Sequence, residues 1–159
     1  MRYAIVGSGG ALAEMKALAK EMGVASRVKF LTNVTDADLP ALYNAASVYV
    51  GMSRELGHDV EGFGISLAEA SASGLPVVAG RSGGIPDVVA DGETGLLIDT
   101  DQPAAVAEAV ARVLGDDSLA RRLGTEGRKR VESYFNWDRV ARDLRTIGHE
   151  YAGASVHAA

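Results

Sequence analysis

The stretch of sequence that decides the fold is residues 64–80, GISLAEASASGLPVVAG. Its first part is typical of a helix running from about Gly64 to Gly74, where a glycine ends it. The continuous apolar run from Pro76 to Ala79 then indicates a strand buried on both faces. A helix followed at once by a buried strand favours an α/β protein with a parallel sheet.

The same alternation of strands and helices extends in both directions from this stretch. Further strands are expected at Arg2–Val6, Val28–Leu31, Ser47–Val50 and Leu96–Ile98. Further helices are expected at Ala11–Met22, after an N-cap at Thr35, from Pro103, from about Ser118 to Tyr134, and from Trp137. We therefore predict a Rossmann-like α/β fold, with a mostly parallel sheet covered by helices on both faces. The predicted domain covers residues 1–151, and residues 152–159 form a disordered tail.

Composition narrows the classes of function. The chain has 159 residues, 47% of them hydrophobic and 23% charged, as expected for one folded domain. A net charge of -5 argues against a nucleic-acid partner. The absence of cysteine excludes a disulfide framework, a thiol nucleophile and any cysteine-ligated metal. Because no apolar stretch is long enough for a signal or a membrane span, we expect a cytoplasmic protein.

A glycine-rich turn, Gly7-Ser8-Gly9-Gly10, follows the first expected strand and opens a helix. This is the setting of a dinucleotide-binding fingerprint, but Leu12 stands at its third glycine position. A tight turn explains the glycines equally well. A dehydrogenase half, the main alternative, would also need an acidic residue closing the second strand, where this chain has Val28–Leu31.

Residues 59–70, DVEGFGISLAEA, carry a stronger signal. Glycines flank Phe63 where a loop meets a helix N-terminus, so free N–H groups and the helix dipole predict an anion site. Glu61 and Glu69 lie eight positions apart, on either side of that site. Carboxylates repel phosphate but accept hydrogen bonds from hydroxyls, and a nucleotide sugar has hydroxyls on both its sugar and its ribose. Taken singly, each glutamate is also explained as an ordinary helical or first-turn acid.

Other charged residues carry less weight. Asp36–Asp38 and Asp99–Asp101 match a D-x-D pattern, but each precedes or opens a helix, where acids cap free N–H groups. His58, Asp59 and Glu61 include a single histidine on one loop, which is weak evidence for a metal site, and we expect none. Arg54 and Arg81 stand in loops at strand ends and are candidates for contacting the phosphates of a nucleotide sugar or a second, anionic substrate. A regulatory nucleotide-binding module remains an alternative, because it would keep the phosphate site without needing the glutamate at position 61.

Glu61, Glu69 and the residues between them resemble the E-x7-E motif of the retaining glycosyltransferase family 4, which has the two-domain GT-B fold. The resemblance extends to residues 5–9, 28–30, 39–46, 76–79, 83–86 and 91–97. By this resemblance the chain is identified as a carboxy-terminal, donor-binding domain. Residues 54–64 are also similar to phosphatidylinositol mannosyltransferases that use GDP-mannose. Nucleotide-sugar epimerases share the architecture and form a further alternative.

The resemblance implies roles for individual residues. Glu61 would be the catalytic residue that holds the transferred sugar, and Glu69 would hold the ribose hydroxyls. The other implied donor-binding residues are Gly7, Phe30, Arg54, Phe63, Gly64, Ile65 and Ser66. Transfer would proceed with retention through an oxocarbenium-like sugar, with backbone amides and basic residues rather than a metal stabilising the leaving diphosphate. No cofactor is implied beyond the GDP- or UDP-sugar co-substrate.

The resemblance also implies what lies outside this chain. The acceptor-binding amino-terminal domain and the basic pair that neutralises the diphosphate would both precede it. We therefore expect the chain alone to transfer no sugar. The acceptor of the full protein would be a membrane-bound lipid or a glycan, with membrane association of the full-length protein. Asp87 departs from the family, which more often has glutamate there.

Overall fold

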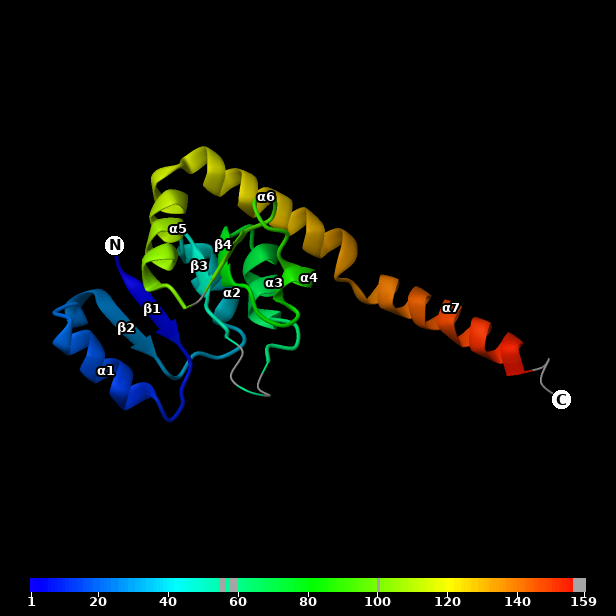
Figure 1. Cartoon of the computed structure of the whole chain (residues 1–159), viewed down its shortest axis with the longest axis horizontal. Helices are drawn as coiled ribbons and strands as arrows, with labels where there is room; N and C mark the ends of the chain where they lie inside the picture. Colours follow the sequence, from blue (N-terminus) through cyan, green and yellow to red (C-terminus); the bar gives the residue numbers. More distant parts are fainter. Residues whose placement is uncertain (55–56, 58–59, 100, 156–159) are drawn as a thin grey trace. The chain divides into compact units, whose positions relative to one another are not determined.

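The computed structural model describes residues 1–54, 57, 60–99 and 101–155 (Figure 1). The chain forms two compact units, Met1–Leu42 and Tyr43–Ala159. Each unit contains its own parallel sheet among the described strands, whereas the sequence led us to expect one sheet in one domain. The Rossmann-like α/β class itself is confirmed, because every described strand pair is parallel and helices connect the strands.

The first unit is a strand–helix–strand unit. It contains β1 (Tyr3–Val6), α1 (Leu12–Glu21), a 3-10 helix η1 (Ala25–Arg27) and β2 (Val28–Leu31). The two strands pair in parallel, with Tyr3 opposite Val28. The amide of Gly7 then donates to the carbonyl oxygen of Leu31 at 3.0 Å, which continues the pairing one residue beyond β1.

Helix α2 (Leu39–Ala45) begins later than the sequence suggested. Thr35 was expected to cap this helix, but its amide and its hydroxyl both donate to Asp38 Oδ2, at 3.1 Å and 2.6 Å. The expectation was wrong because Thr35 belongs to a separate turn before the helix. In that turn the Thr35 carbonyl oxygen accepts the Asp38 amide at 2.9 Å. These hydrogen bonds lower the pKa of the Asp38 carboxyl.

The second unit is built on a three-stranded sheet of order β3-β4-β5. Its strands are β3 (Tyr49–Gly51), β4 (Val77–Gly80) and β5 (Leu96–Ile98). The helices between and after them are α3 (Ile65–Ala72), α4 (Ile85–Val88), α5 (Pro103–Gly115), α6 (Asp117–Tyr134) and α7 (Trp137–Ser155). All four residues of the central strand β4 are buried, as its continuous apolar sequence predicts.

Alternate residues of β4 pack on opposite faces of this sheet. Val77 and Ala79 belong to a core cluster with residues of α3 and α4, including Leu67 and Ile85. Val78 belongs to a second cluster with residues of α5 and α6, including Leu119 and Leu123 of α6. Helices therefore cover both faces of the sheet, as predicted.

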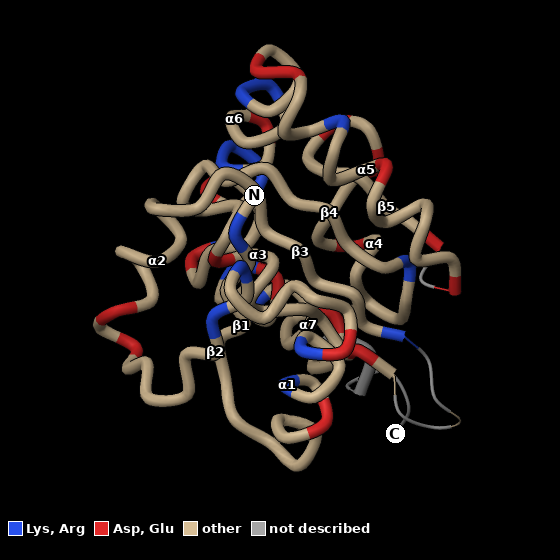
Figure 2. The backbone as a smooth tube through the Cα atoms, turned by 90° about the vertical axis from the view of Figure 1, so that its left-hand side faces the viewer, with Lys and Arg blue, Asp and Glu red and all other residues tan. Residues whose placement is uncertain are grey.

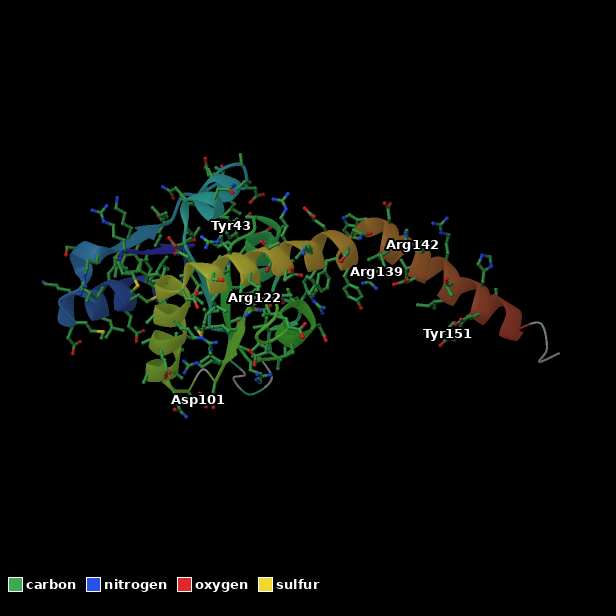
Figure 3. The ribbon with its side chains drawn as sticks, turned by 90° about the horizontal axis from the view of Figure 1, so that it is seen from above. Tyr43, Asp101, Arg122, Arg139, Arg142 and Tyr151 are labelled. Atoms are coloured by element: carbon green, nitrogen blue, oxygen red, sulfur yellow. The ribbon has the colours of Figure 1, made fainter. Side chains whose placement is uncertain are left out.

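Helix α7 continues further than the sequence suggested. Residues 152–155 fall within it, although they were expected to belong to the tail, and residues 156–159 lie outside the described part of the chain. Its apolar side chains are exposed: Trp137 retains 85% and Leu144 64% of its accessible surface. Figure 3 labels Arg139, Arg142 and Tyr151 along this helix.

Helix α6 carries charges of both signs along its length (Figure 2). Lys129 pairs with Glu126 and Arg128 with Glu132, in each case at 2.7 Å. A mixed surface of this kind differs from the single-sign stripe of a nucleic-acid-binding helix.

Candidate functional site

The candidate site lies at the carboxyl edge of the β3-β4-β5 sheet. Because parallel strands end at the same edge, the loops after β3 and β4 emerge side by side there. The first loop leads from Met52 to the start of α3 at Ile65, and the second leads from Arg81 to the start of α4 at Ile85.

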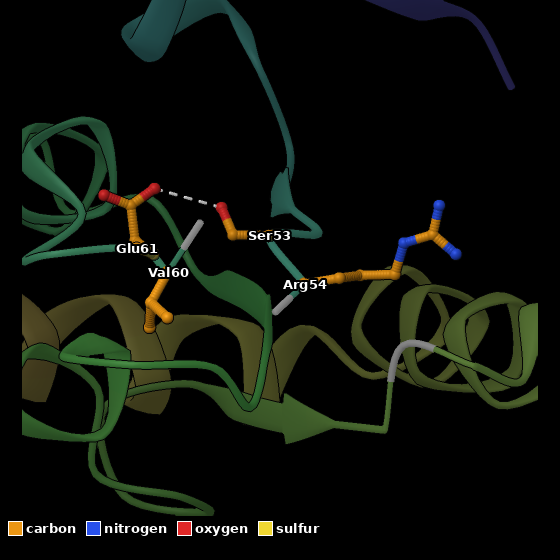
Figure 4. A pocket seen from close by; sticks show the side chains of 4 residues that line it. All are labelled: Ser53, Arg54, Val60 and Glu61. Carbon is orange, nitrogen blue, oxygen red and sulfur yellow. Dashed lines mark hydrogen bonds between the residues drawn. The ribbon is translucent and has the colours of Figure 1, made fainter. Parts of the chain in front are cut away.

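Glu61 holds the end of the first loop through both of its carboxylate oxygens. Its Oε1 accepts the Gly64 amide at 3.2 Å, and its Oε2 accepts the Ser53 hydroxyl at 3.1 Å (Figure 4). The side chain is half-buried. A carboxylate has about four lone-pair sites, so these two donors leave room for a hydroxyl of a bound ligand. Ser53 was not predicted from the sequence, because its hydrogen bond to Glu61 joins residues eight positions apart in a loop, where no helical or strand periodicity relates them.

The two loops are tied together by their backbones. The amide of Gly84 donates to the Glu61 carbonyl oxygen at 2.9 Å. A Cβ atom at Gly84 would overlap with the carbonyl oxygen of Gly62. This close approach explains the glycine, because any side chain would push the loops apart. A glycine pair in the short loop after a buried strand is the sequence signal for such an approach.

The N-terminus of α3 opens to solvent next to Glu61. Gly64 precedes the helix with a φ of +84°, a conformation that favours glycine. Its carbonyl oxygen accepts the amides of Leu67 at 3.0 Å and Ala68 at 3.2 Å. Ile65 and Ser66 are exposed, and the first N–H groups of a helix have no partner within it. The positive end of the helix dipole is therefore accessible to an anion.

Glu69 lies on the exposed side of α3 and is held by a tyrosine. Its Oε2 accepts the hydroxyl of Tyr43, at 2.9 Å. The neighbouring Tyr49 hydroxyl donates to Ser66 Oγ at 2.8 Å, and the two tyrosine rings lie 6.0 Å apart. Burial, together with the hydrogen bond and the charge of Glu69, raises the pKa of Tyr43 above its ordinary value. Sequence reasoning missed both roles, because the two tyrosines fit the apolar patterns of their helix and strand.

The side chain of Phe63 packs on the end of α6. Its ring meets the Phe135 ring edge-on at 5.2 Å, and Phe135 meets Tyr134 in the same way at 5.0 Å. The ring is thus occupied by aromatic packing. Its backbone lies directly before Gly64, at the start of α3.

The two candidate arginines differ in their surroundings. Arg54 lines a pocket of about 320 Å³ together with Ser53, Val60 and Glu61. Figure 4 shows its side chain extending away from Glu61. Arg81 forms an ion pair with Asp91 at 2.8 Å, and both side chains are about half exposed. An exposed pair of this kind is weak, so Arg81 is free to exchange partners.

Two further predicted donor residues, Gly7 and Phe30, belong to the first unit. Gly7 has a φ of +128° and follows β1 directly. Phe30 is half-buried in β2, with the Lys16 ammonium 5.7 Å from the centre of its ring.

Of the acidic pairs, Asp38 accepts the Thr35 amide in the turn before α2, whereas the expected cap on the helix after Asp99–Asp101 is wrong, because α5 begins after Gln102 with no side-chain cap. The amide of Asp101 donates to Asp99 Oδ1 at 3.2 Å. His58 and Asp59 lie outside the described residues. Over residues 1–54, 57, 60–99 and 101–155, no group of three histidine or acidic side chains is arranged to hold a metal ion. Within the same part of the chain, none of the helices is both long and apolar enough to cross a lipid bilayer.

Comparison with known proteins gives a family. The model of "Glycosyl transferases group 1" matches residues 1–130. The chain is 42% identical over 142 residues to the GDP-mannose-dependent alpha-(1-6)-phosphatidylinositol monomannoside mannosyltransferase of Mycobacterium tuberculosis, covering 88% of this chain and 37% of that protein. The chain therefore spans little more than a third of the length of this relative.

Solved structures agree with this family. Sucrose-phosphate synthase from Thermosynechococcus elongatus superposes with a TM-score of 0.78 at 34% identity, covering 95% of this chain and 38% of that one. Anabaena HepE in complex with UDP gives a TM-score of 0.78 at 23% identity, covering 92% of this chain and 41% of that chain. At that identity HepE supports the fold alone.

The family model covers both described sheets and the whole segment from Glu61 to Glu69. It therefore decides against the dehydrogenase alternative, which shares only the strand–helix alternation. The chain belongs to the group 1 glycosyl transferases.

Proposed function

We propose that this chain binds the donor of a retaining glycosyltransferase and that the donor is GDP-mannose. The observation that carries the proposal is the placement of Glu61 and Glu69 on either side of the exposed N-terminus of α3. The relative from Mycobacterium tuberculosis, which is named for its dependence on GDP-mannose, supports this choice of donor.

The diphosphate would bind at the start of α3. The first amides of the helix, those of Ile65 and Ser66, and the positive end of its dipole favour an anion there. The Ser66 hydroxyl adds a further donor on the exposed side of the helix. The backbone around Phe63 and Gly64 brings the transferred sugar close to the diphosphate.

The two glutamates would bind the hydroxyls at the two ends of the donor. Glu61 is fixed by Ser53 and Gly64 and would accept a hydrogen bond from a hydroxyl of the mannose. Glu69, one and a half turns into α3, would accept hydrogen bonds from the ribose.

Catalysis in this proposal is electrostatic and needs no metal. Amides at the start of α3, with Arg54 or Arg81, would stabilise the charge that develops on the leaving diphosphate. Glu61 would stabilise the oxocarbenium-like sugar through its hydroxyl contact. The acceptor, a lipid at a membrane surface or a glycan, would be positioned by a separate amino-terminal domain, so that this chain alone would transfer no sugar.

Titration calorimetry of the chain with GDP, UDP and NAD tests the proposal. GDP should bind, and Glu69→Gln should weaken it about ten- to a hundredfold, the range expected when a hydrogen bond to a charged group is lost. Binding of NAD alone would overturn the proposal. If Glu69→Gln binds GDP as tightly as the wild type does, Glu69 does not contact the nucleotide.

A further inference from the structure

The hydrogen bond from Tyr43 to Glu69 joins the end of α2 to the middle of α3. The two residues are 26 positions apart in the chain, and their oxygens lie 2.9 Å apart. The Tyr43 ring packs against the buried cluster that includes Leu67 and Ala70, the residues before and after Ala68 and Glu69 on α3. Core packing therefore fixes the ring, and the ring delivers its hydroxyl to one carboxylate oxygen.

An exposed glutamate without such a partner would move among several side-chain conformations. If a ligand must fix such a side chain in one conformation, the lost conformational entropy weakens binding. Tyr43 holds the Glu69 carboxylate in one orientation before any ligand arrives. It uses one lone pair of Oε2, so the carboxylate keeps lone pairs for the hydroxyls of a ligand.

The hydrogen bond between Tyr43 and Glu69 persists over a wide range of pH. A tyrosine hydroxyl is protonated at neutral pH. Burial and the contact with Glu69 raise the pKa of Tyr43 further, so its hydroxyl remains a donor into alkaline pH. A donor that stays neutral holds the carboxylate without cancelling its charge, and Glu69 stays a strong acceptor.

We propose that Tyr43 is a positioning residue for the donor, orienting Glu69 toward the two adjacent hydroxyls of the nucleotide ribose. The inference rests on the proposed function, because it assumes that Glu69 meets the ribose. Tyr43 itself acts through Glu69 and does not touch the donor.

Tyr43→Phe tests this inference, because it removes the hydroxyl and keeps the ring that packs on the core. Calorimetry should compare GDP with 2′,3′-dideoxy-GDP, which lacks both ribose hydroxyls. We expect GDP to bind about three- to tenfold more weakly to the variant, the effect of one lost hydrogen bond. The affinity for the dideoxy analogue should not change, and the melting temperature shows whether both proteins are equally folded.

Tyr49→Phe is the matched control. It also removes one tyrosine hydroxyl beside α3, but that hydroxyl contacts Ser66 and not Glu69. Any loss of affinity in this variant should be the same for GDP and for its dideoxy analogue. If Tyr43→Phe behaves in that way too, its role is structural and the inference is wrong.

A double-mutant cycle separates the inference from the proposal beneath it. In a Glu69→Ala background, Tyr43→Phe should have no further effect on GDP binding. If Glu69→Ala weakens GDP but Tyr43→Phe does not, the positioning role fails while the donor site stands. If Glu69→Ala binds GDP as the wild type does, or if neither GDP nor UDP binds, the proposed site fails and the inference fails with it.

Discussion

The amide of Gly84 donates to the carbonyl oxygen of Glu61 across 2.9 Å, and this bond joins two loops that leave neighbouring strands. The Glu61 side chain turns the other way, toward Ser53 and the Gly64 amide. Glu61 is therefore anchored to the loop after β4 by its backbone and to its own loop by its side chain. Both anchors hold the residue beside the start of α3.

Gly84→Ala should destabilise the protein, because the new Cβ would overlap with the Gly62 carbonyl oxygen. We expect the free energy of unfolding to fall by about 2–4 kcal/mol, as for other substitutions that force packed backbone apart. Gly115→Ala is the control, since a Cβ there meets no atom within 4 Å. Urea unfolding of both variants checks the prediction, and equal stabilities would contradict it.

Leucine truncation should cost much more stability in α6 than in α7. Leu123 is fully buried, and Leu123→Ala should lower the free energy of unfolding by about 2–5 kcal/mol. Leu144 is 64% exposed, and Leu144→Ala should change the free energy of unfolding by less than about 0.5 kcal/mol. Chemical denaturation of the chain gives both values. A large loss from Leu144→Ala would mean that the outer face of α7 is covered in solution.

The stability of the chain should decline in alkali partly through Tyr43. The folded protein holds the phenolic proton of Tyr43 more tightly than the unfolded chain, in which tyrosine titrates near pH 10. Its contribution is therefore complete below about pH 10 and is lost as the pH rises further. Unfolding of the wild type and Tyr43→Phe should give parallel pH profiles from pH 7 to 9. Above pH 10 the wild type should lose stability more steeply, and profiles that stay parallel would count against the shift.

Glu61→Gln should affect the binding of the sugar but not the binding of the nucleotide. We expect GDP to bind the variant as tightly as it binds the wild type, while the preference for GDP-mannose over GDP falls about tenfold. Ser53→Ala, which removes the donor to Oε2, should change the preference in the same direction by a smaller amount. Competitive calorimetry measures both ratios. Equal weakening of the two ligands would show that Glu61 only supports its loop.

The sequence predicted those parts of the fold that depend on local patterns. The apolar run at Pro76–Ala79 predicted a buried strand, and helices α3 and α4 cover one face of it while α5 and α6 cover the other. The short helix α4 was missed, because four residues after a glycine pair carry no periodicity. In α7 the spacing of Trp137 and Leu144 correctly indicates one apolar face, but periodicity does not say whether that face is covered.

The candidate site divides in the same way. The spacing of Glu61 and Glu69 around a helix start could be read from the chain, because both residues belong to one loop and its helix. Ser53 and Tyr43 could not, since each reaches its glutamate only after the loop or α2 has folded against α3. Tertiary contacts of single hydroxyl groups leave no periodic trace in a sequence.

The anchoring of Glu61 also bears on how this protein could diversify. Its position depends on three contacts, with the Ser53 hydroxyl, the Gly64 amide and the Gly84 amide. A lineage, or a protein engineer, could therefore vary the side chains around Glu61 as long as these three contacts were kept.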